Sequence, residues 1–173
     1  YNGITVPKEH FLDLPLFLRD GMIPVIVGMP PYHYWEPPPE RGYLPMNGPD
    51  AGLFRVSEVL GARNMIYVKD VDGLFVEDPK KNPRAKFIPR ISVEKLLEMD
   101  LDDLPIERAV LSALRTARHT TRIRIINGLI PGNLTKALEG RSVGTVIFRE
   151  GQGPDQPLAG APAEPLRGDG RAR

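Results

Sequence analysis

Residues 68–87 read VKDVDGLFVEDPKKNPRAKF, and this stretch decides the fold class. The apolar run at 65–68 predicts a strand, and Lys69 and Asp70 follow this strand directly. In open parallel sheets, ligands bind beyond the carboxyl ends of the strands, because side chains and backbone groups converge there on a crevice. The segment that begins at Lys69 is therefore a candidate binding loop.

Helical and strand-like patterns alternate on both sides of this loop. Asp50 is predicted to cap one of the helices and Gly61 to close it. Strands that alternate with helices indicate an α/β fold with a mostly parallel sheet covered on both faces. The pattern predicts strands at 23–27, 65–68, 123–126 and 143–148, and helices at 11–18, 50–60, 92–99, 105–118 and 133–140.

Composition favours a cytoplasmic protein. The net charge is +1 with 26% charged residues, so neither a nucleic acid nor a membrane is expected as a partner. No apolar run approaches the ~18 residues of a membrane span. The absence of cysteine excludes disulfides and fits a reducing compartment. The chain opens at Tyr1 and its first strong strand signal comes only at Ile23, so we expect further residues upstream.

Two segments depart from the alternating pattern. Residues 29–49 hold seven of the 19 prolines beside several aromatic side chains, which indicates a rigid insertion packed against something. Residues 151–173 are rich in Gly and Pro and are expected to be disordered in isolation. We therefore predict one domain over 1–150 and a tail over 151–173.

The loop after the strand at 65–68 carries groups suited to a nucleotide. Gly73 lets the backbone approach a ligand closely, lysines can face phosphate charge, and aspartates can order Mg²⁺ or a ribose hydroxyl. Two plainer interpretations stay open: Asp72-Gly73 is also a hairpin signal, and residues 79–83 are typical of a solvated loop. The candidates are Lys69, Lys80 and Lys81, and Asp70, Asp72 and Asp78.

The quoted stretch resembles the nucleotide loop of the amino acid kinase family, above all the uridylate kinases, in which a strand leads into a similar Val-Asp-Gly and a later Asp-Pro. The resemblance continues through 91–97, 122–127 and 143–147, and covers roughly 12–150. It implies the C-terminal half of a three-layer αβα sandwich, with ATP across the loop and Phe75 and Asp78 near the base or ribose. The implied nucleotide-binding residues are Lys69, Asp70, Val71, Asp72, Gly73, Phe75, Asp78 and Lys81.

The segment before Asp50 departs from the uridylate kinases. By position, Asp50 matches the Asp that ends their Thr-Thr-Asp motif, but Gly48 and Pro49 replace the two threonines. Proline offers neither a hydroxyl nor an N–H, so polar contacts to an acceptor uridylate are lost. This departure argues against uridylate kinase activity.

The insertion that begins at Pro30 is similar to that of the molybdenum storage proteins, a family with the same fold. This resemblance implies ATP-dependent storage of molybdate or tungstate as polynuclear oxo clusters, with Mg²⁺ accompanying ATP. It also implies a hexameric cage of two related subunit types. His33 is the candidate metal ligand, because a neutral imidazole nitrogen binds d-block metals. The implied cluster-binding residues are His33, Tyr32, Trp35, Glu36 and Asp50.

Three alternatives stay open. His33 and Tyr34 could instead cover a subunit interface. The chain could be a phosphotransferase acting on a nucleotide or another small acceptor. It could also be a catalytically silent subunit that keeps the fold and pairs with an active homologue. No catalytic residue that activates water is identified by the sequence.

Overall fold

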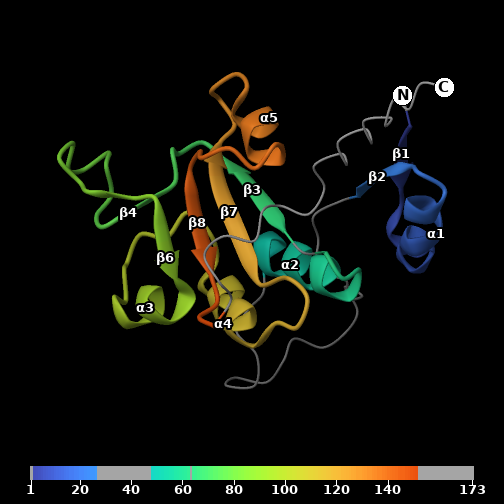
Figure 1. Cartoon of the computed structure of the whole chain (residues 1–173), viewed down its shortest axis with the longest axis horizontal. Helices are drawn as coiled ribbons and strands as arrows, with labels where there is room; N and C mark the ends of the chain where they lie inside the picture. The colour runs from blue at the N-terminus through green and yellow to red at the C-terminus, as the bar shows by residue number, and fades with distance from the viewer. Residues whose placement is uncertain (1, 27–47, 63, 152–173) are drawn as a thin grey trace, which may run out of the picture.

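The computed structural model describes residues 2–26, 48–62 and 64–151 of the chain (Figure 1). Nearly all of the predicted insertion at 29–49 lies outside these residues, as does the predicted tail beyond Gly151. The assignment of 1–150 to a single domain therefore stays a prediction.

The described elements alternate between strands and helices. Their order is β1 (Gly3–Val6), the 3₁₀ helix η1 (Lys8–Asp13), α1 (Leu14–Arg19), β2 (Ile23–Ile26), α2 (Pro49–Val59), β3 (Met65–Lys69), β4 (Leu74–Phe75), β5 (Phe87–Ile88), β6 (Arg90–Ser92), α3 (Val93–Glu98), α4 (Arg108–Thr116), β7 (Arg122–Asn127), α5 (Asn133–Leu138) and β8 (Thr145–Phe148).

The central sheet has the strand order β3-β7-β8-β6. β3 runs parallel to β7 and β6 runs parallel to β8, whereas β7 and β8 are antiparallel. The prediction of a mostly parallel sheet is therefore confirmed. Two smaller pairs accompany it in the described residues, a parallel pair of β1 with β2 and an antiparallel pair of β4 with β5.

One face of the central sheet carries the main core. Side chains alternate across the sheet along each strand, so Ile123 and Ile125 of β7 point to one face and Ile126 points to the other. The first two isoleucines pack into one buried cluster with side chains of α2, α3 and α4, including Phe54 and Leu114. Ile126 is also fully buried, on the face where α5 contacts β7. Helices therefore lie on both faces, as in an αβα arrangement.

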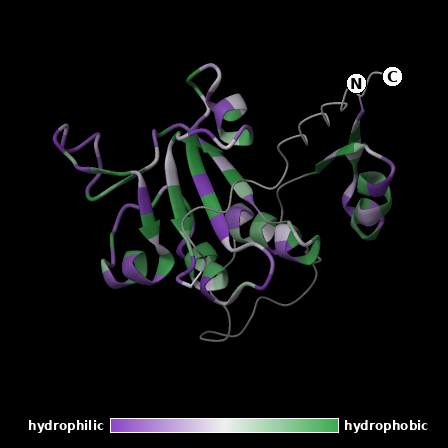
Figure 2. Ribbon diagram, viewed as in Figure 1, coloured by the Kyte–Doolittle hydropathy of each residue, from purple (hydrophilic) through white to green (hydrophobic). Residues whose placement is uncertain are grey.

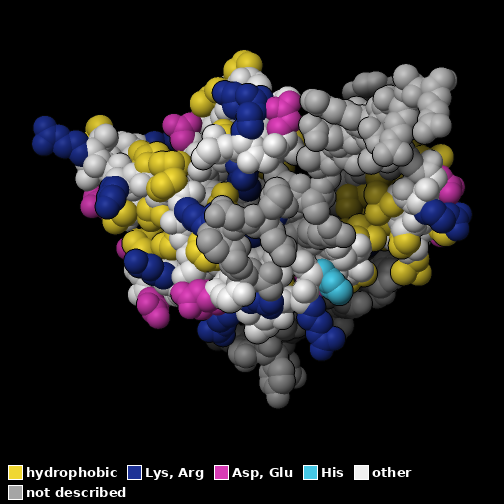
Figure 3. All heavy atoms as spheres, viewed as in Figure 1, with side chains coloured by type: hydrophobic (Ala, Val, Ile, Leu, Met, Phe, Trp, Pro, Cys, Tyr) yellow, Lys and Arg dark blue, Asp and Glu magenta, His cyan; other side chains and the backbone are white. Residues whose placement is uncertain are grey.

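The alternation is visible along β7 in Figure 2, where hydrophilic and hydrophobic positions follow one another. Two of the hydrophilic positions are Arg122 and Arg124, which lie on the same face as Ile126. In the view of Figure 3, basic and acidic side chains are interspersed on the surface, in keeping with a net charge near zero.

Helix ends follow local chemistry at some places and tertiary contacts at others. A helix was predicted to start at Ser92, and Ser92 is the N-cap of α3, with its hydroxyl accepting a hydrogen bond from the amide of Lys95. The helix predicted at 105–118 is shorter, because Glu107 is extended at its start and Ala117 is extended at its end.

β1 was not predicted, since Gly3–Val6 is a short strand whose pairing partner lies twenty residues later.

Glu58 ties α2 to the turn before β7. Its carboxylate accepts hydrogen bonds from the backbone amides of Arg118, His119 and Thr120. Burial alone would raise the pKa of Glu58, but these amide donors outweigh it and lower the pKa below its usual value. The carboxylate is thus held ionised at neutral pH, which fixes the position of α2 beside the sheet.

No helix in the described part of the chain is long and apolar enough to cross a membrane.

Candidate functional site

Four side chains meet where the start of α2 approaches the end of β3. We call them the Asp50 cluster: Asp50, Tyr67, Lys69 and Glu107. The ammonium group of Lys69 lies 2.9 Å from both carboxylate oxygens of Asp50. Both side chains are largely shielded, with 27% of Lys69 and 15% of Asp50 exposed. An ion pair so shielded from water fixes the geometry of both partners.

Glu107 caps α2 from outside the helix. Its carboxylate accepts hydrogen bonds from the backbone amides of Gly48 at 2.9 Å, Asp50 at 3.1 Å and Ala51 at 3.2 Å. The N-cap residue itself is Gly48, which has no side chain to accept these donors. The prediction that Asp50 caps this helix is therefore wrong, because its carboxylate is turned toward Lys69 and the cap comes from Glu107, the residue just before α4.

The cluster is closed by two further hydrogen bonds. The amide of Glu107 donates to Asp50 Oδ2 at 3.3 Å, and the Tyr67 hydroxyl donates to the backbone carbonyl of Asp50 at 2.8 Å. Burial, followed by the negative charges of Asp50 and Glu107, raises the pKa of Tyr67. Tyr67 therefore stays a neutral hydrogen-bond donor at physiological pH. Together these contacts join α2, β3 and α4 at one point.

The turn after β3 is fastened to the turn after β7. Lys69 and Asn127 are partners at the ends of these parallel strands. The Asn127 side-chain amide donates to Asp72 Oδ1 at 2.8 Å, and its side-chain oxygen accepts from the amide of Leu129 at 2.9 Å. Asp72 thus has a structural partner that orients the loop entering β4.

A cavity of about 260 Å³ opens beside this loop. We call it the β3–β4 cavity. Its walls come from two segments, the loop around β4 and the loop between α3 and α4. The lining residues are Val71, Gly73, Phe75, Glu77, Asp78, Pro79, Lys80, Asp102, Asp103, Leu104 and Pro105.

The cavity is more acidic than basic. Its lining includes Asp78, Asp102 and Asp103, and one ammonium group, that of Lys80. Lys81 lies nearby, with its ammonium 3.1 Å from Asp103 Oδ2. Its hydrogen bond to Asp103 and the adjacent negative charges raise the pKa of Lys81. Such a lining suits groups that donate hydrogen bonds, such as ribose hydroxyls and base amino groups, more than it suits phosphates.

Gly73 is required by the protein itself. Its φ is +145°, and a Cβ there would lie 2.5 Å from the Thr145 hydroxyl oxygen. That hydroxyl accepts a hydrogen bond from the Leu74 amide and donates one to the Ile88 carbonyl. The backbone of Gly73 is thus approached closely by Thr145 of β8, at the position where the sequence predicted the close approach of a ligand. Asp72-Gly73 is not a hairpin tip either, because β4 pairs with β5 and β3 pairs with β7.

The structure divides the eight predicted nucleotide-binding residues. Val71, Gly73, Phe75 and Asp78 line the β3–β4 cavity, whereas Lys69 joins the Asp50 cluster. The remaining three, Asp70, Asp72 and Lys81, do not line the cavity. Asp50 was predicted to bind the metal-oxo cluster and Lys69 to bind the nucleotide, and the structure joins these two side chains in an ion pair. The other predicted cluster-binding residues, Tyr32, His33, Trp35 and Glu36, lie outside the described residues.

Sequence reasoning missed the contribution of the loop between α3 and α4. Asp102, Asp103 and Glu107 reach the site from a segment that follows the predicted loop in the sequence and is separated from it by α3. The acidic pair before Pro105 was the only available signal, and nothing in the local sequence indicates where it lies in space.

The described residues do not bring together three or more His, Asp or Glu side chains in a way that could hold a metal ion. Of the predicted Mg²⁺ ligands, Asp70 and Asp78 both lie near Lys80, whose ammonium is 3.9 Å from Asp70 Oδ2 and whose backbone amide donates to Asp78 Oδ1. Asp72 accepts a hydrogen bond from Asn127. The binding of Mg²⁺ together with ATP, through one of these aspartates, stays a prediction.

Comparison with known proteins relates the chain to the amino acid kinase family and to its members. A profile of this family matches residues 12–127. The molybdenum storage protein subunit beta of Azotobacter vinelandii is 45% identical over 134 residues, which are 78% of this chain and 50% of that protein. A uridylate kinase of Thermofilum pendens is 29% identical over 152 residues, which are 85% of this chain and 60% of that enzyme. The chain thus spans about half the length of the first relative.

Solved structures agree on the fold. The uridylate kinase of Archaeoglobus fulgidus has a TM-score of 0.63 at 23% identity, covering 84% of this chain and 61% of that one. The UMP kinase of Bacillus anthracis has a TM-score of 0.64 at 19% identity, covering 86% and 58%. At these identities, the likeness concerns the fold alone.

The packing at Gly73 predicts a large loss of stability on substitution. Gly73→Ala should lower the free energy of unfolding by about 2–4 kcal/mol, because it adds steric overlap with Thr145 to backbone strain. Gly61→Ala is the matched control, since Gly61 also has a positive φ but open space around its Cβ position. It should cost only about 1 kcal/mol. Urea unfolding measures both, and equal losses would show that the contact with Thr145 is unimportant.

Proposed function

The chain belongs to the amino acid kinase family, and on that premise we propose that it is part of a protein that stores molybdate or tungstate as oxo clusters with the help of ATP. The observation that carries the proposal is the identity to a molybdenum storage protein subunit, which exceeds the identity to the uridylate kinases. Storage by such a protein would take place in an oligomer, with a related subunit of the same fold as partner.

The β3–β4 cavity is the proposed site for the nucleoside of ATP. Its volume of about 260 Å³ suits a base with its ribose better than a complete nucleoside triphosphate. Phe75 supplies an aromatic contact for the base, and the carboxylates of Asp102 and Asp103 accept hydrogen bonds from hydroxyl or amino groups. The acidic lining repels phosphates, so the triphosphate would extend out of the cavity toward lysine side chains. When bound, ATP supplies the free energy of hydrolysis for metal loading.

The Asp50 cluster supports storage over phosphoryl transfer to uridylate. Pro49 is the first residue of α2 and has no N–H, while the amide of Gly48 donates to Glu107. The Asp50 carboxylate accepts from Lys69. Groups at the positions of the Thr-Thr-Asp motif therefore either lack donors or are engaged within the protein. A site built to hydrogen-bond its substrate loses much affinity when those groups are missing.

The oxyanion site itself is proposed to involve His33, with Tyr32, Trp35 and Glu36 nearby in sequence. These residues belong to the insertion at 29–49, which directly precedes Asp50, and Asp50 is proposed to border the same site. The competing function, a phosphotransferase with a small acceptor, draws on the similarity to uridylate kinases and glutamate 5-kinases.

Filling the β3–β4 cavity should weaken ATP binding. Val71→Trp places a large ring in the cavity and should raise the Kd for ATP at least about tenfold, which corresponds to about 1.4 kcal/mol. Val59→Trp, at an 86% exposed position on α2, is the matched control and should leave the Kd unchanged. Calorimetric titration of the folded variants with ATP decides the matter. An unchanged Kd for ATP in Val71→Trp would show that the nucleotide does not bind in this cavity.

Removal of the candidate metal ligand should reduce storage. His33→Ala should retain at least about tenfold less molybdenum after loading with molybdate and ATP, since even indirect supporting groups of metal sites cost that much when removed. His10→Ala is the control, because His10 is an exposed side chain bonded to Asp13. Retained metal is measured by elemental analysis after gel filtration. Full loading of the His33→Ala protein would exclude His33 from the site.

A further inference from the structure

A cavity at the outer edge of the central sheet is not used by the proposed function. β6 is the last strand in the order β3-β7-β8-β6, and the cavity opens beside it. We call it the edge cavity. Its volume is about 570 Å³, within the range typical of small-molecule sites. The lining residues are Val76, Lys86, Phe87, Ile88, Pro89, Arg90, Ile91, Ser92, Lys95, Met99, Phe148 and Glu150.

The segment around β4 separates the edge cavity from the β3–β4 cavity. Phe75 lines the β3–β4 cavity, whereas the next residue, Val76, lines the edge cavity. Successive side chains of an extended segment point to opposite sides, so each cavity receives its own set. The two cavities share no lining residue. A ligand of the edge cavity therefore needs neither ATP nor molybdate in order to bind.

Much of the lining of the edge cavity is apolar and aromatic. Phe87, Met99 and Phe148 all contribute to it, and each is half-buried. The ring of Phe87 is held edge to face against that of Phe75, with ring centroids 5.3 Å apart. Figure 3 shows hydrophobic side chains gathered over the part of the molecule that holds β4 and β6, with basic side chains beside them. A flat hydrocarbon ring placed on such a lining would lose its contact with water and gain hydrophobic free energy.

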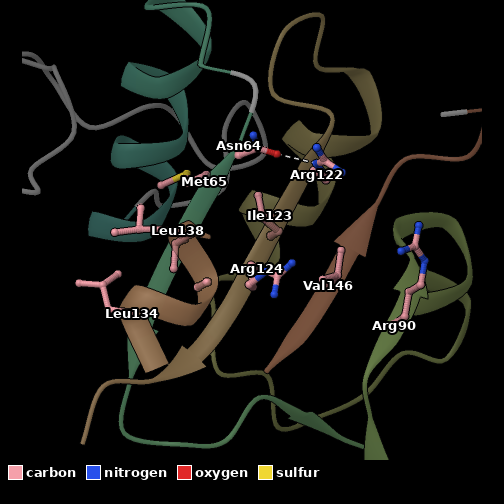
Figure 4. Close-up of a pocket in the computed structure, with 11 residues that line it drawn as sticks. Asn64, Met65, Arg90, Arg122, Ile123, Arg124, Leu134, Leu138 and Val146 are labelled. Carbon is pink, nitrogen blue, oxygen red and sulfur yellow. Dashed lines mark hydrogen bonds between the residues drawn. The ribbon is translucent and has the colours of Figure 1, made fainter. Parts of the chain in front are cut away.

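Arg90 lies between the edge cavity and a neighbouring cavity of about 450 Å³ beside α5, and it lines both. Figure 4 shows Arg90 on β6, on the far side of that neighbouring cavity from α5. The guanidinium of Arg90 stacks over the ring of Phe148, 4.5 Å from its centroid, and has a further protein partner. We therefore assign Arg90 to the wall of the edge cavity and look to other side chains for the charge that meets a ligand.

Two lysines supply that charge. Lys86 comes just before β5 and Lys95 lies on α3, so the two side chains approach the edge cavity from different elements. Both are exposed, and neither ammonium group forms a hydrogen bond or an ion pair within the described residues. The lining has one carboxylate, that of Glu150, which accepts a hydrogen bond from the Ser92 hydroxyl at 2.9 Å. An incoming anion would thus meet ammonium groups without displacing a protein partner from them.

From these contacts we infer that the edge cavity binds a small aromatic carboxylate, with its ring against Phe87 and Phe148. The carboxylate of this ligand pairs with Lys86 and Lys95. A single negative charge suits the lining, because Glu150 repels a more highly charged anion more strongly. A neutral aromatic molecule would leave the ammonium groups without a partner, and a small aliphatic carboxylate would leave the aromatic lining in contact with water.

The probe is 2-naphthoate, titrated into the full-length protein by calorimetry without ATP or molybdate. We expect saturable binding that is at least about tenfold tighter than that of acetate, which lacks the ring, and of naphthalene-2-methanol, which lacks the charge. Lys95→Glu and Lys86→Glu should each raise the Kd for 2-naphthoate at least about tenfold, because each replaces an attractive charge with a repulsive one.

Two matched variants serve as controls. Arg115→Glu makes the same change of net charge at an exposed position on α4 and should leave the Kd for 2-naphthoate unchanged. Val71→Trp fills the β3–β4 cavity and should also leave it unchanged, which separates this inference from the proposed nucleotide site. Circular dichroism and the thermal midpoint verify that each variant is folded.

Four results would each overturn the inference. They are the absence of saturable binding, equal affinity for naphthalene-2-methanol, an unchanged Kd for 2-naphthoate in folded Lys95→Glu, and a loss of affinity in Arg115→Glu or Val71→Trp as large as that in Lys95→Glu.

Discussion

The hydrogen-bonded carboxylates of Asp50 and Glu107 are the constraint on which the site depends. Helix α2 begins at Pro49 after the N-cap residue Gly48, and neither residue can cap it with a side chain. Glu107, 57 residues away, supplies the missing acceptors, and its own amide binds Asp50. Asp50 in turn holds Lys69 at the end of β3. Three segments far apart in the sequence thus become one rigid corner, and the loop that borders the β3–β4 cavity starts from it.

Sequence patterns predicted what depends on local chemistry. The strand at 65–68, the helix that starts near Ser92 and the α/β class follow from periodicity and side-chain type, and the structure confirms them. The cap of α2 was predicted wrongly, since an acidic residue at a helix start normally caps it, whereas here Glu107 supplies the cap and the Asp50 carboxylate binds Lys69. Asp102 and Asp103 were missed for the same reason, because tertiary packing alone brings them to the cavity.

The two cavities have opposite electrostatic character. The β3–β4 cavity is lined by several carboxylates and accepts hydrogen bonds, whereas the edge cavity is lined by three basic side chains and a single carboxylate. The first lies beyond the carboxyl end of a parallel strand, where α/β folds commonly bind ligands. The second lies at the outer edge of the sheet beside β6, and the segment around β4 separates it from the first. A single chain thereby offers two chemically distinct surfaces to small molecules.

The central proposal is that this chain serves ATP-dependent oxyanion storage and not phosphorylation of a nucleotide. The most direct measurement incubates the full-length protein, with its partner subunit where one copurifies, with molybdate in the presence and absence of ATP, and determines the molybdenum that stays bound after desalting. The account predicts abundant retained metal with ATP and little without it. A protein that retains no molybdenum under either condition but phosphorylates uridylate would contradict the account.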